Sequence, residues 1–148
     1  MIGPVVKRSE ALAWETPASS PHQRRFGLYF ERDVTPTTNM AVGYVLLPRG
    51  EEQPKLSSHD GTEEVYYVVR GHGAFVLDDR TVDLEPGTAV YVAPGVKHRA
   101  LNTGSEELDL LWMNTPPPFG RIGGYVDAVD GWTRIPGSVS GALSGCVL

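Results

Sequence analysis

Glycine and proline interrupt this chain at short intervals, and helical periodicity is weak throughout. The 148 residues include 17 Gly and 12 Pro, and between them lie short runs of Val, Tyr, Leu and Phe. Short runs of β-formers that turn residues separate at regular spacing are typical of an all-β sandwich or barrel. We expect strands at seven places: 26–32, 40–47, 64–70, 73–78, 88–93, 97–102 and 107–114.

Charge and composition narrow the class of protein. The chain is 41% hydrophobic and 21% charged, with a net charge of -5, as in ordinary globular domains. No basic cluster is longer than Arg24-Arg25, so we expect no nucleic-acid partner. The apolar runs are far shorter than the ~18 residues that a membrane span needs, and no signal peptide is recognisable. The single cysteine, Cys146, has no internal disulfide partner. We therefore expect a protein of the cytoplasm with no membrane partner.

Three segments are expected along the chain. Residues 1–25 form an N-terminal segment and a polar connector, and residues 26–115 form the β-barrel. Residues 116–148 are rich in Gly, Pro and Ser, which predicts a C-terminal arm and tail.

The stretch "SSHDGTEEVYYVVRG", residues 57–71, places titratable groups at the start of an apolar strand. Strand alternation puts Glu64 and Tyr66 on one face. His59 is five positions before Glu64, so an unbroken strand would turn the two side chains to opposite faces. The intervening "DGT" supplies a turn, with Gly61 as the permissive residue. Both side chains can then point into the barrel.

A second histidine occupies a similar place in "PGVKHRALN", where Pro94-Gly95 makes a turn and His98 opens a strand. Buried imidazole and carboxylate groups are costly unless they are paired. If His59, Glu64 and His98 meet, they form a facial triad of two histidines and one carboxylate for a metal ion. Without an ion, the two histidines are hydrogen-bonded structural residues, and the residues alone leave both interpretations open.

Two stretches carry a family resemblance. Gly50…Ser57-x-His59-x4-Glu64-x6-Gly71 resembles the first cupin motif, and Gly87…Pro94-Gly95-x2-His98-x3-Asn102 resembles the second. The similarity covers about residues 41–113. It implies a small single-domain cupin of the type-2 conserved-barrel kind. Such proteins are double-stranded antiparallel β-barrels (jelly rolls), often dimeric, with one divalent metal ion inside.

The sequence departs from the family pattern at one position. Ser57 stands where the first cupin motif usually has a histidine, so His59, Glu64 and His98 match three of the usual four metal ligands. Either the fourth direction is open to water, dioxygen or substrate, or the site has lost its metal affinity and its chemistry. The sequence does not distinguish among iron, manganese, nickel and zinc as the bound ion.

From this resemblance we expect a metal-dependent enzyme for a small-molecule substrate, of oxygenase type, in which Tyr66 and Ser57 orient the substrate. The alternatives are a redox-neutral isomerase, cyclase or lyase that uses zinc or nickel, and a non-catalytic module that binds a small ligand. We also expect a homodimer, because "EVYYVV" and "LDLLWM" are apolar on both faces.

Overall fold

The computed structural model describes residues 6, 8–17, 23–30, 39–51, 56–117 and 132–134. A 3₁₀ turn, η1 (Ser9–Ala11), precedes the first strand. The strands are β1 (Trp14–Pro17), β2 (Arg25–Phe30), β3 (Ala41–Leu47), β4 (Glu63–Arg70), β5 (Gly73–Leu77), β6 (Arg80–Leu84), β7 (Ala89–Val92), β8 (His98–Leu101), β9 (Leu108–Thr115) and β10 (Trp132–Arg134). No helix among these residues is long and apolar enough to cross a membrane.

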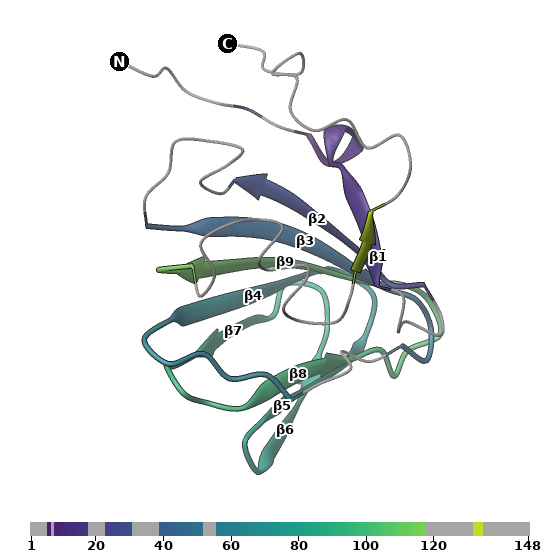
Figure 1. Ribbon diagram of the computed structural model, residues 1–148. Helices are drawn as coiled ribbons and strands as arrows, with labels where there is room; N and C mark the ends of the chain where they lie inside the picture. Colours follow the sequence, from purple (N-terminus) through teal and green to yellow (C-terminus); the bar gives the residue numbers. More distant parts are fainter. Residues whose placement is uncertain are drawn as a thin grey trace.

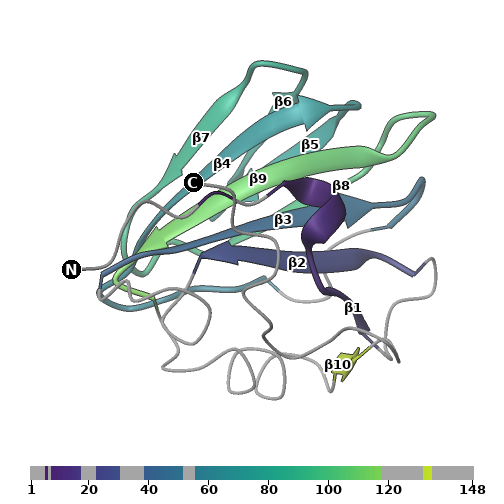
Figure 2. The same cartoon turned by 90° about the horizontal axis from the view of Figure 1, so that it is seen from above.

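The strands form two antiparallel sheets, which confirms the all-β prediction. The larger sheet has the order β10-β1-β2-β3-β9-β4-β7, and the smaller one has the order β6-β5-β8. In Figure 1 the strands β2, β3, β9 and β4 run side by side, with β5, β6 and β8 below them. Figure 2 shows the larger sheet from above, with β1 and β10 at its outer edge.

The core lies between the two sheets and follows the alternation expected for β4. Tyr66 and Val68 are buried, whereas Tyr67 and Val69 on the other face are exposed. Tyr66 of the larger sheet meets Phe75 of the smaller sheet, with ring centroids 4.8 Å apart. Burial of such side chains removes apolar surface from water and holds the two sheets together.

Gly43 and Trp112 fix the inner face of the larger sheet. The Trp112 ring stacks on Phe26 at a centroid distance of 5.2 Å and lies across Gly43. A Cβ atom on Gly43 would be 2.8 Å from the indole nitrogen and closer still to two ring carbons. Trp112 is therefore a core residue, and residue 43 must lack a side chain.

All seven expected strands are present, with ends that differ by a few residues, and residues 31–32 lie outside the described part. Three strands were not predicted: β1, β6 and β10. In β6 only Leu84 is buried and the four preceding residues are exposed. Of the expected C-terminal arm, only 116–117 and β10 are described, and β10 pairs with β1. The division into 1–25, 26–115 and 116–148 stays a prediction.

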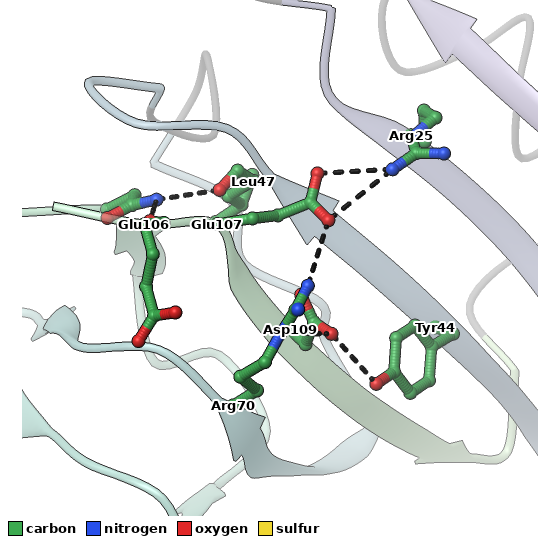
Figure 3. Close-up of polar contacts among 8 residues, drawn as sticks. Arg25, Tyr44, Leu47, Arg70, Glu106, Glu107 and Asp109 are labelled. Carbon is green, nitrogen blue, oxygen red and sulfur yellow. Dashed lines mark hydrogen bonds and ion pairs between the residues drawn. The ribbon is translucent and has the colours of Figure 1, made fainter. Parts of the chain in front are cut away.

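An ionic network joins four strands or their ends on the solvent side of the larger sheet (Figure 3). Glu107 accepts hydrogen bonds from Arg25 at 3.1 Å and from Arg70 at 3.2 Å. Arg70 also pairs with Asp109 at 3.2 Å, and the Tyr44 hydroxyl donates to Asp109 at 3.4 Å. Burial and the nearby Asp109 carboxylate raise the pKa of Tyr44 to about 12. Charged residues are usually exposed, but these neighbours leave Asp109 only 8% exposed.

Candidate metal centre

A tight turn brings His59 to the face of β4 that carries Glu64. Gly61 lies in the turn with φ at +78°, in the left-handed region that favours glycine. The Thr62 N–H donates to the His59 carbonyl at 3.4 Å and closes the turn. The predicted turn is therefore present.

Backbone hydrogen bonds tie the two histidine-bearing segments together. Ser57 and His98 form an antiparallel bridge, with N–O distances of 2.9 and 2.8 Å. The Gly95 N–H donates to the His59 carbonyl at 3.1 Å. Residues directly opposite each other in an antiparallel pair share a face, so Ser57 and His98 point the same way. This pairing brings together residues that are about 40 positions apart in the sequence.

The three expected ligands converge. Glu64 Oε1 lies 3.6 Å from His59 Nε2 and 3.5 Å from His98 Nε2. One ligand atom from each residue lies within 4.8 Å of the other two. Two ligands that are each about 2.1 Å from one ion are about 3.4 Å apart in a tetrahedral arrangement. The spacing fits a single divalent ion.

Neighbouring groups orient two of the ligands. His98 Nδ1 is 3.0 Å from the Val96 carbonyl oxygen. Because a carbonyl only accepts, Nδ1 is the donor in this contact, and Nε2 is the ring atom directed at Glu64 Oε1. The Tyr66 hydroxyl donates to Glu64 Oε2 at 3.1 Å, which leaves Oε1 directed at the histidines. In each of these two side chains one atom, His98 Nε2 or Glu64 Oε1, is thus directed at the candidate site.

Burial differs among the three ligands. The side chains of Glu64 and His98 are each 2% exposed, and that of His59 is 14% exposed. Burial lowers the pKa of His59, and His98 lowers it further, whereas the Glu64 carboxylate acts in the opposite direction. A lowered pKa favours the neutral imidazole, which is the form that binds metals.

Two further expectations concern Tyr66 and Ser57. Tyr66 is buried beside the site, and its hydroxyl touches Glu64. Ser57 is half-buried and shares the inner face with His98. Their assignment as residues that orient the substrate stays a prediction. Asn102 holds the turn at 102–106 through hydrogen bonds to Leu47, Gly104 and Glu106.

Sequence reasoning missed Asn114. It lies opposite Glu64 in the β4–β9 ladder and is 1% exposed. The signal was present, because Asn114 is the fourth residue of the inward series, after Leu108, Leu110 and Trp112. A polar residue in such a series marks either a buried hydrogen bond or a site.

Comparison with known proteins identifies the family. A family model described as a cupin domain matches residues 43–114. An uncharacterized protein from Streptomyces coelicolor is 34% identical over 79 residues, which are 53% of this chain and 72% of that protein. The chain belongs to the cupin family.

Other matches agree with this cupin fold. A glucose-6-phosphate isomerase from Pyrococcus abyssi is 30% identical over 112 residues, which are 72% of this chain and 57% of that protein. The chain spans 28–50% of the length of three further curated relatives. A structure described as a predicted oxalate decarboxylase from Thermotoga maritima has a TM-score of 0.67 at 22% identity. The match covers 76% of this chain and 99% of that one. The two sheets are therefore those of a cupin jelly roll.

Proposed function

We propose that His59, Glu64 and His98 hold one divalent metal ion in a site that carries out a redox-neutral, isomerase-type reaction on a small, oxygen-rich molecule. One observation carries the metal site. The ligand atoms converge while the other polar atoms of His98 and Glu64, Nδ1 and Oε2, are already hydrogen-bonded. Such outer contacts orient ligands in metal sites.

The chain's own residues have separate roles in this proposal. A bound divalent ion would polarise a carbonyl or hydroxyl oxygen of the substrate. Tyr66 keeps a proton at Glu64 Oε2 and so holds the carboxylate in one orientation. Ser57, on the inner face beside His98, offers a hydroxyl to a substrate oxygen. The burial of Glu64 and His98 excludes bulk water from this end of the barrel.

The names of the relatives support the redox-neutral reaction, because several are glucose-6-phosphate isomerases. The donor set supports a second candidate, the oxygenase expected from the sequence. Two histidines and one carboxylate with open positions are the ligands of non-haem iron oxygenases.

Proton exchange and oxygen uptake distinguish the two reactions. Chelator-treated protein would be reloaded with zinc, nickel, manganese or iron(II) and incubated in D₂O with glucose 6-phosphate, fructose 6-phosphate and simple hydroxyketones. We expect metal-dependent deuterium incorporation next to the carbonyl, without oxygen uptake, and its loss in His98→Ala. Oxygen uptake in step with product would favour the oxygenase. Metal-loaded protein inactive in both assays would favour a binding module.

We also propose that a second copy of the chain covers the outer face of β4, β7 and β9. Large apolar side chains gather there with high exposure: Tyr67 42%, Val69 45%, Tyr91 57% and Met113 38%. Light scattering should give twice the 16.1 kDa chain mass at micromolar concentration. Tyr91→Glu should yield monomers, whereas the same change at the exposed Val82 of β6 should not. A monomeric wild-type protein would contradict the dimer.

A further inference from the structure

Asn114 lies on the inner face of the larger sheet, beside the candidate metal centre. In the strand register it is opposite Glu64 of β4 on one side and opposite Ala41 of β3 on the other. Side chains directly opposite each other in antiparallel strands point to the same face. The Asn114 amide therefore points into the barrel next to the Glu64 carboxylate.

This amide is buried and lacks a hydrogen-bond partner within the described part of the chain. Asn114 is 1% exposed, and neither its Oδ1 nor its Nδ2 has a hydrogen-bond partner among the described residues. Asn102 shows the contrast, because its amide is 4% exposed and makes three hydrogen bonds to the backbone. Buried amide groups that lack partners destabilise a fold, so an apolar side chain of the same shape would suit position 114 better. Packing does not account for the amide at this position.

We propose that Asn114 binds a hydroxyl group of the substrate. The substrate would carry this hydroxyl on the carbon next to a carbonyl carbon, and the carbonyl oxygen would bind the metal ion. This inference rests on the proposed metal site of His59, Glu64 and His98. An amide offers one donor group and one acceptor, which matches a hydroxyl that also donates and accepts. The neighbouring Glu64 carboxylate disfavours a second anionic group at this position.

The small side chain of Ala41 leaves the amide flanked by a methyl group on one side and by Glu64 on the other. His59 is the most exposed of the three metal ligands, so the substrate enters beside His59. Its chelating oxygen then meets the three ligands, and its hydroxyl reaches Asn114.

The first test is thermal unfolding of chelator-treated protein. Asn114→Leu, which is nearly isosteric, should raise the melting temperature by a few degrees, because it removes two unsatisfied polar atoms. The matched control is Asn102→Leu, which breaks three hydrogen bonds and should lower it. A lower melting temperature for Asn114→Leu would overturn the proposal, because the amide would then have a structural role.

The second test uses two chelating probes that differ by one hydroxyl, acetohydroxamate and glycolohydroxamate, with metal-loaded protein. Wild type should bind glycolohydroxamate about tenfold more tightly. Asn114→Leu should lose this preference and keep its affinity for the metal and for acetohydroxamate. Thr115→Ala, an exposed neighbour, should behave as wild type.

Three results would contradict this proposal or the proposed metal site, and they distinguish which of the two has failed. An unchanged preference in Asn114→Leu would show that the amide does not contact the hydroxyl. A parallel loss of metal affinity would make Asn114 a metal ligand instead. Wild-type protein that binds no ion would contradict the proposed function. The melting temperatures of Asn114→Leu and wild type would then decide whether the Asn114 amide has a structural role or a ligand-binding one.

Discussion

The hydrogen bond from Tyr66 to Glu64 should set much of the affinity for the metal ion. Tyr66→Phe removes only the hydroxyl and keeps the ring that packs on Phe75. The lost contact is a 3.1 Å bond to one carboxylate oxygen, between two buried side chains. Hydrogen bonds to charged groups contribute about 1.5–3 kcal/mol.

Removal of such an outer contact typically weakens metal binding 10–100-fold, which is about 1.4–2.7 kcal/mol. The two ranges agree, so we expect the dissociation constant of Tyr66→Phe to rise by one to two orders of magnitude. The reason is that Glu64 can then rotate and present Oε2 as well as Oε1.

Competition with a chromophoric chelator, at fixed pH and for one metal, would measure this affinity. Tyr67→Phe is the matched control, because Tyr67 is the next residue of β4 and points outward, 42% exposed. It should bind the metal as wild type does. Metal affinity of Tyr66→Phe within twofold of wild type would refute the role of this hydrogen bond.

Three other perturbations have defined outcomes. Gly43→Ala should lower the free energy of unfolding by about 1–3 kcal/mol in denaturant titration, because its Cβ would collide with the Trp112 ring; unchanged stability would contradict this packing. Ser57→His should raise metal affinity by about an order of magnitude, roughly 1.4 kcal/mol, because residue 57 shares a face with His98; no change would mean that residue 57 does not face the ion. The melting-temperature gap between metal-loaded and chelator-treated protein should be clear at pH 7.5 and smaller at pH 5, because protons compete with the ion for imidazole. Burial lowers the pKa of His59, so the unfolded chain takes up this proton near pH 6.5 and the folded protein only below that. The stability of the metal-free protein should therefore also fall as pH decreases through this window. A melting-temperature gap between metal-loaded and chelator-treated protein that does not shrink at pH 5 would argue against histidine ligands.

The sequence predicted those parts of the fold whose signal is local. The apolar alternation of β4 and the turns at Gly61 and Gly95 can be read from neighbouring residues, and the structure has them where they were expected. The site followed from the same features, because a turn between His59 and Glu64 leaves few other ways to bury both side chains.

Most of the missed features depend on contacts between distant residues, and β6 is the exception. It pairs with the neighbouring β5 across the two-residue turn Asp78-Asp79, and most of its side chains are exposed. β1 pairs with β10, which lies more than 100 positions further along the chain, and no local sequence pattern predicts this pairing. Asp109 is covered by Arg70 and Tyr44, which are distant in sequence. The position of Asn114 beside Glu64 follows from the register of β9 on β4, which alternation alone does not fix.

Metal analysis of protein purified without chelators and without affinity-column metal tests the central claim most directly. Wild type should carry about one divalent ion per chain, bound by His59, Glu64 and His98. His98→Ala should lose most of the metal and keep the circular dichroism of a folded barrel, whereas the same change at the exposed His72 should leave the metal content unchanged. Wild-type protein without metal, or full metal content in folded His98→Ala, would contradict the account.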